Sequence, residues 1–325
     1  MQSPLDGVSE LVGVFQNPGL LLGIPLALAG AVFMSFGAQY QHRGVTKVER
    51  LSGQGGAQGL TFAQVKRLLT RPSWVVGTLM LALAIACQLG ALSVAPLIVV
   101  QPLGAVSLVI TTLLNARVSG HTPTTRSLRA IIACVGGIFL FVLVAALFAA
   151  EKAISAAQTI TVLIVLLGVA AILVTLWLIV RRRQVRALFY VLAAGVLYGF
   201  VATLAKTVIN RIQTGQFEWL TLVCVVALVG TTVLGAYFVQ TAYSSGPPDL
   251  AIAGLTVVDP MVAVLIGLLV LGEGVAVPLW GFIVFVVAGG VAVWGVISLA
   301  LNHPQVISES QELGITRGSD PSAGA

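Results

Sequence analysis

Residues 91–107 read ALSVAPLIVVQPLGAVS, an apolar run that holds the pattern Val-Val-Gln-Pro at residues 99–102. The pattern returns as Val-Val-Asp-Pro at residues 257–260, 158 positions further along the chain and again within an apolar run. A proline inside a helix removes one backbone hydrogen bond, and a polar residue beside it is costly in apolar surroundings. Two such sites in one chain indicate an internal duplication.

The duplication extends to both sides of this pattern. Residues 28–42 (LAGAVFMSFGAQYQH) line up with residues 192–206 (LAAGVLYGFVATLAK), and the glycine pair at residues 136–137 lines up with the pair at 289–290. Each match alone is weak, because apolar helices resemble one another by chance. Their common order along the chain favours two related halves.

The composition is that of a membrane protein. Hydrophobic residues make up 58% of the 325 residues and charged residues only 9%. A soluble domain carries about 25% charged residues, so this composition excludes a soluble enzyme and predicts an all-α, polytopic membrane protein. The net charge of +6 would suit a nucleic-acid partner, but the basic residues lie in short loops between apolar runs. That placement is typical of membrane orientation, and we expect no nucleic-acid binding.

The lengths of the apolar runs predict about nine transmembrane helices. Spans two and three are joined by a tight hairpin that contains Ser93, Ala95 and Pro96. The nine predicted spans are 19–40, 74–92, 94–115, 128–149, 159–180, 187–210, 217–243, 250–272 and 278–300.

The spans predict two four-helix repeats, at residues 19–149 and 187–301, joined by a connector helix and its basic loop at residues 150–186. Because five crossings separate the first spans of the two halves, the halves are inverted repeats, a common basis of alternating access in secondary transporters. Residues 1–18 precede the first repeat. Residues 302–325 are rich in Ser, Gly and Glu and predict a disordered tail.

The basic residues predict the orientation of the chain in the membrane. Fourteen of the seventeen Lys and Arg residues fall on one side, in the long loop 41–73, the third and fifth connections and the tail. The positive-inside rule makes this side cytoplasmic, so the N-terminus is expected outside a plasma (inner) membrane and the C-terminus in the cytoplasm. Within the long loop, residues 60–69 predict a short amphipathic helix on the membrane surface.

The plan of four spans, a connector and four spans resembles the drug/metabolite transporter superfamily. Residues 91–107 look like the Pro-Leu-Gly segment of its NIPA-type branch, and residues 37–45 (GAQYQHRGV) are similar to that branch's first helix. The eighth span, with Pro260 at its centre and Leu-Gly-Glu at residues 271–273, resembles the EamA-type helix. The resemblance implies a secondary transporter, and the NIPA-type branch implies magnesium transport.

Asp259 is the acidic residue that lies well inside a predicted span, nine residues or about 13 Å from its start. Pro260 has no N–H for the carbonyl of residue 256, so the acid would lie beside a freed backbone oxygen. This arrangement suggests a cation or proton site, and the alternative is a structural carboxylate bonded to a neighbouring helix. Gln101 is the repeat partner of Asp259, and it either faces the same cavity or forms hydrogen bonds between helices.

Three further polar residues are candidates for contact with a substrate or ion. Tyr198 and Gln88 lie at mid-depth, and Tyr198 either lines a polar cavity or packs, as its repeat partner Met34 suggests. Lys206 lies toward the outer end of span six. It either pairs with Asp259 or extends to the outer interface.

Tyr237 and Gln240 share one face of span seven by their three-residue spacing, and they belong either to a substrate vestibule or to the polar belt at the interface. Glu273 lies at the outer end of span eight, where we expect its charge to reach water. The glycines that we expect at helix contacts are Gly136, Gly137, Gly289 and Gly290.

The sequence thus predicts a secondary transporter that moves a small solute by alternating access, with or without proton coupling. One alternative is a magnesium or other divalent-cation permease with Asp259 as the metal ligand. Another is a lipid flippase or a non-transporting membrane partner. With no nucleophile arrangement or phosphate-binding loop, we expect no enzyme and no cofactor. The expected partners are the solute or ion, the lipid bilayer and a second copy of the chain in a homodimer.

Overall fold

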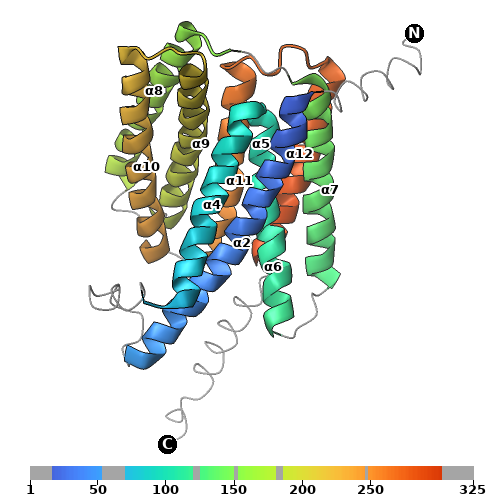
Figure 1. Cartoon of the computed structure of the whole chain (residues 1–325), viewed down its shortest axis with the longest axis vertical. Helices are drawn as coiled ribbons and strands as arrows, with labels where there is room; N and C mark the ends of the chain where they lie inside the picture. The colour runs from blue at the N-terminus through green and yellow to red at the C-terminus, as the bar shows by residue number, and fades with distance from the viewer. Residues whose placement is uncertain are drawn as a thin grey trace, which may run out of the picture.

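A computed structural model of the chain describes residues 17–52, 70–119, 125–149, 153–180, 186–245 and 248–301. Throughout these ranges the regular structure is helical (Figure 1). The helices are α2 (Pro18–Ser52), α4 (Pro72–Val94), α5 (Leu97–Gly104), α6 (Val106–Ser119), α7 (Thr125–Phe148), α8 (Ala156–Val180), α9 (Arg186–Gln213), α10 (Trp219–Ser245), α11 (Pro248–Leu269) and α12 (Leu279–Leu301).

The fold is that of a polytopic helical membrane protein. Eight helical stretches of 18–26 residues within the described ranges are long and apolar enough to cross a bilayer, with α5 and α6 counted together. Helix α11 adds a shorter apolar stretch, Gly254–Leu269. Large apolar side chains such as Leu167 and Val286 are 70% and 76% exposed. Such side chains suit contact with lipid rather than with water.

Two predicted spans differ from the structure. Helix α2 continues through Ser52, so the predicted loop 41–73 begins as helix. Hydropathy marks where a chain leaves the membrane, and a helix can continue beyond that point. The third predicted span is two helices that meet at Ala105, whose N–H donates to the carbonyl of Pro102 at 3.2 Å instead of to the carbonyl four residues back.

Several predictions fall outside the described residues. These concern residues 1–16, the surface helix at 60–69 and the tail at 302–325.

The first helices of the two halves run in opposite directions, as the five crossings predict. Gly19 at the start of α2 lies against Val94 at the end of α4, so these two helices are antiparallel. The side chain of Lys206, in the last third of α9, reaches Ala95 at that same end. Helix α9 therefore ends where α2 begins.

The helix contacts recur in the two halves. Helix α2 packs on α4 and on the α5–α6 pair, and α9 packs likewise on α10 and α11. The α5–α6 pair contacts α7, as α11 contacts α12. The halves meet through α5 with α11 and through α7 with α12. Helices α5 and α11, which carry Pro102 and Pro260, thus lie at the junction of the halves.

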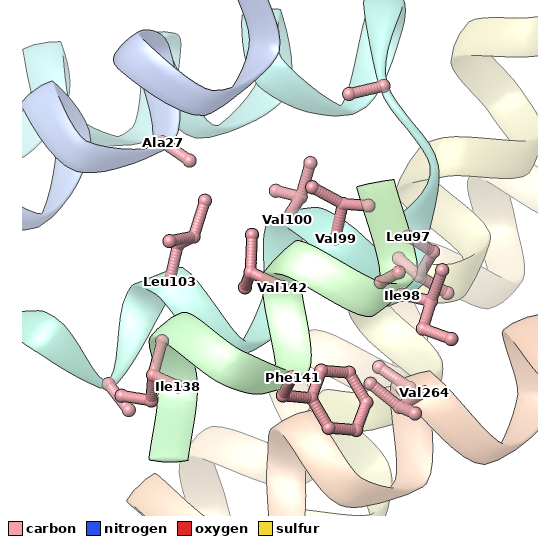
Figure 2. Packing of buried hydrophobic residues seen from close by; sticks show 14 of the residues in the cluster. Ala27, Leu97, Ile98, Val99, Val100, Leu103, Ile138, Phe141, Val142 and Val264 are labelled. Carbon is pink, nitrogen blue, oxygen red and sulfur yellow. The ribbon is translucent and has the colours of Figure 1, made fainter. Parts of the chain in front are cut away.

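Helix α5 lies in the hydrophobic core. Leu97, Ile98, Val99 and Val100 have no measurable exposure, and they belong to one cluster with Val142 of α7 and Val264 of α11 (Figure 2). Burial on all sides explains why this eight-residue helix is almost entirely apolar.

Only one glycine of each predicted pair lies against another helix. A Cβ at Gly137 would lie 2.6 Å from the backbone nitrogen of Ala292, and one at Gly289 would meet Phe141 at 3.8 Å. At Gly136 and Gly290 nothing lies within 4 Å, so the predicted packing role of these two is wrong. Successive helix positions point about 100° apart, so both members of a pair cannot face one partner.

Candidate functional site

A cavity of about 370 Å³ lies among α2, α4, α5, α6, α9 and α11. Four residues that the sequence singled out line it: Asp259, Gln101, Tyr198 and Gln88. Met34, the repeat partner of Tyr198, lines it as well. The polar positions of the two halves therefore face one space, as the alignment of the repeats predicts.

Asp259 brings a carboxylate to this cavity from the middle of α11. Its Oδ1 atom is buried and has no hydrogen-bond partner among the described residues. A buried acceptor without a partner costs about 1–3 kcal/mol, and more when it is charged. The sequence left open that Asp259 is a structural carboxylate bonded to a neighbouring helix, and Oδ1 makes no such bond to a described residue. This oxygen can accept a proton, or a hydrogen bond from a ligand.

The neutral polar residues reach the cavity from three other helices. Gln101 is 6% exposed and lies on α5, which contacts α11. Gln88 comes from α4 and Tyr198 from α9. The Tyr198 ring lies against Gly235 of α10, where a Cβ would be 3.5 Å from the ring. The amides and the phenol offer both donors and acceptors.

The described residues that line the cavity carry negative charge only. Among the described residues that line it, Asp259 carries the one formal charge, and none is Lys, Arg or His. A search of the described residues finds no group of three or more His, Cys, Asp or Glu residues able to hold a metal ion. A ligand that brings its own positive charge would therefore meet a single carboxylate in largely apolar surroundings.

A smaller, apolar cavity of about 90 Å³ lies on the other side of the two prolines, among α5, α7, α11 and α12. Ala105, Thr256 and Pro260 line both cavities. The junction of α5 and α11 is therefore hollow on both sides.

Three predicted site residues do not line either cavity. Tyr237 is 56% exposed and Gln240 is exposed, so both lie on the outer face of α10. Three-residue spacing shows that two residues share a face, but not which face it is. Lys206 is 2% exposed, and its Nζ donates a hydrogen bond of 2.7 Å to the carbonyl of Ala95. The prediction that its side chain extends to the interface is wrong.

Glu273 is a buried residue whose role the sequence reading missed. It is only 4% exposed, so its predicted access to water is wrong. Its Oε1 accepts a hydrogen bond from the N–H of Leu97 and its Oε2 one from the N–H of Ile98, both at 2.8 Å. A carboxylate at this helix start is favourable, because the first N–H groups of a helix lack partners within the helix.

The chain reaches this position through a tight turn after α11. Gly272 has a φ of +74°, which glycine adopts without strain. The N–H of Glu273 donates to the carbonyl of Gly267 at 3.0 Å, and a Cβ at Gly267 would lie 2.9 Å from Oε2. One signal could have pointed to this contact. Pro96 precedes α5 and supplies no side-chain cap, so the α5 N–H groups need an acceptor from elsewhere.

Comparison with known proteins finds a relative that matches most of the chain. The chain is 26% identical over 283 residues to a protein of Corynebacterium glutamicum that is described as uncharacterized. The match covers 86% of this chain and 95% of that protein. No family profile and no solved structure matches the chain.

Proposed function

We propose that this membrane protein is a secondary transporter of the drug/metabolite superfamily that moves a small solute through the cavity at Asp259. The observation that carries the proposal is a buried carboxylate oxygen without a partner, in a cavity where two antiparallel halves meet. An ionisable group in such surroundings is costly, and it is usually kept for function.

In this proposal each cavity residue has a distinct task. Asp259 binds a proton or the cationic part of the solute, because the lining offers no positive charge of its own. Gln101 and Gln88 orient the solute through their amides, and Tyr198 supplies an aromatic face and a hydroxyl. The halves then rock about their junction, so that the cavity faces each side of the membrane in turn.

Replacing Asp259 tests this proposal. The Asp259→Asn variant keeps the shape of the side chain but removes its charge and its ability to release a proton. Proteoliposomes would be tested for uptake of ethidium, glucose and glutamate at several pH values. We expect the variant to lose uptake of the accepted solute by at least tenfold, the equivalent of about 1.4 kcal/mol.

The matched control for this experiment is Gln240→Ala, which changes an exposed amide on the outer face of α10. It should transport like the parent chain. Unchanged transport by Asp259→Asn across the pH range would remove the proposed role of the carboxylate.

A divalent-cation permease is the second candidate. The observation in its favour is that one carboxylate and several neutral oxygen donors share a cavity with room for a partly hydrated ion. Magnesium prefers oxygen ligands and retains several waters. Uptake of magnesium into liposomes loaded with a magnesium-sensitive dye tests this candidate. No response at millimolar magnesium would dismiss it.

A further inference from the structure

The turn between α4 and α5 is held by side chains from the other half of the protein. Lys206 of α9 donates to the carbonyl of Ala95 at 2.7 Å. Glu273, after α11, accepts hydrogen bonds from the first two N–H groups of α5. Gln213 at the end of α9 donates to the carbonyl of Ser93 at 3.0 Å. The cation thus binds a carbonyl and the anion binds N–H groups within four consecutive residues.

Two of these contacts involve deeply buried charged side chains. Lys206 is 2% exposed and Glu273 is 4% exposed. Burying such groups is costly unless hydrogen bonds compensate, and here the compensation comes from the backbone of the opposite half. Loss of either contact would leave a buried charge and a buried backbone group without these partners.

The two side chains lie at one end of the cavity and are close in sequence to residues that line it. Lys206 directly follows Ala205, which lines the cavity. Glu273 follows α11, which carries Asp259, and it binds α5 one turn before Gln101. At this end α2 begins and α4 and α9 end, and the basic residues predict that it faces outward.

We propose that Lys206 and Glu273 form the gate that closes the cavity at this end. Both must release the α4–α5 turn before the two halves can part there. Gln101 lies on the short helix that Glu273 holds, so release of the gate also frees a cavity residue to move. The role in transport rests on the proposed function, whereas the closure itself can be tested without a substrate.

Accessibility of a cysteine in the cavity tests the gate. In a background with Cys87, Cys134 and Cys224 replaced by Ala, Ala202→Cys places a thiol on the cavity wall. A membrane-impermeant maleimide is applied to one face in intact cells and to the other in inverted vesicles. In the parent chain we expect labelling to be slow from the end where α2 begins and faster from the opposite end.

Glu273→Gln and Lys206→Met should each speed labelling from the gated end by about tenfold or more. Glutamine directs an N–H toward a backbone N–H, and methionine offers no donor to Ala95. Loss of a hydrogen bond made by a charged group is large enough to shift the equilibrium between the closed and the open gate by this factor. Labelling from the opposite end should stay unchanged or slow down. If Glu273→Gln does not accumulate, Glu273→Asp should shift labelling in the same direction by a smaller factor.

Two controls separate the gate from simpler explanations. Glu218→Gln removes an exposed carboxylate that pairs with Arg211 rather than with the backbone of the α4–α5 turn, and it should label like the parent. The exchange of both charges, Lys206→Glu with Glu273→Lys, should label as fast as either single variant, because each side chain then meets the wrong backbone group.

Three outcomes would overturn the gate. The first is labelling within twofold of the parent rate in both single variants, and the second is equally faster labelling from both ends. The third is slow labelling in the charge-exchange variant, which would indicate that Lys206 and Glu273 act as a simple ion pair and not through the backbone of the turn. If the variants label as expected but no solute is transported, the gate stands and the proposed function fails. If Asp259→Asn abolishes transport while labelling never responds to the gate variants, the proposed function stands and the gate fails.

Discussion

Two carboxylates in this protein lie in opposite chemical situations. Both oxygens of Glu273 accept backbone hydrogen bonds, whereas Oδ1 of Asp259 has no partner among the described residues. A saturated carboxylate contributes to holding the fold together. An unsaturated one adds a cost to the fold that a ligand or a proton can remove. The two residues therefore differ at the level of single atoms: Glu273 holds the start of α5, and Asp259 presents an oxygen that a proton or a ligand can bind.

Sequence reasoning found one of these carboxylates and missed the role of the other. Asp259 stands out because it interrupts an apolar run, and Gln101 was found through the repeat. Glu273 lies where a helix ends, and a charge at a helix end is ordinarily solvated. Its burial depends on a turn that folds it back onto α5, and that contact spans the two halves. Local patterns do not report such long-range contacts.

Gly235 offers a test of Tyr198. Because a Cβ at Gly235 would lie 3.5 Å from the Tyr198 ring, Gly235→Ala fits with an ordinary contact, while Gly235→Leu pushes the ring into the cavity. We expect Gly235→Leu to raise the KM of the transported solute by about tenfold, or about 1.4 kcal/mol. Gly230→Leu, on the same helix with nothing within 4 Å, should leave the KM unchanged. Equal KM values for both leucine variants would contradict a role of the Tyr198 position.

At the scale of elements, hydropathy predicts which segments of the chain form helices, but it does not predict where those helices begin and end. The nine apolar runs all correspond to helices or to the α5–α6 pair within the described residues. Helix α2 extends past its apolar part, and the third span breaks after Pro102. Hydropathy records the apolar environment of a residue. The break at Ala105 depends on which backbone partners the N–H groups there find, and α11 shows that an internal proline does not by itself end a helix.

The contact between α7 and α12 gives an element-scale prediction with a control one residue away. Gly137→Val places a side chain against the backbone of Ala292 and Ala288 and should separate the two helices. We expect a loss of about 1–3 kcal/mol, seen as a lower Tm in detergent. Gly136→Val points to open space and should change stability by less than about 0.5 kcal/mol. Similar Tm values for the two variants would contradict the observed helix face.

At the scale of the whole molecule, the repeat predicted more than any single residue did. A match between short patterns, together with an odd number of crossings, predicts that the first helices of the halves run in opposite directions, and this is confirmed. The choice of solute could not be predicted in the same way. It depends on the shape of a cavity lined by five helices and the start of α6, and a list of residue types does not define that shape.

The orientation of the whole chain in the membrane stays a prediction with a direct test. Fourteen of seventeen basic residues fall on one predicted side, which places the C-terminus in the cytoplasm. Fluorescent protein fused after residue 325 should therefore fluoresce, and alkaline phosphatase at the same position should be inactive. The opposite pair of results would invert the assignment of the gate to the outer face.

The hydrogen bonds between Glu273 and the start of α5 join residues 175 and 176 positions apart. Synthesis proceeds from the N-terminus, so α5 enters the bilayer well before its capping residue exists. Lipid offers no acceptor for the first N–H groups of α5. Until the second half has been inserted, these groups must therefore bond to water or to the insertion machinery. The last loop to be made thus completes a helix in the first half. A chain that ends before Glu273 would therefore lack the carboxylate that accepts the first two N–H groups of α5.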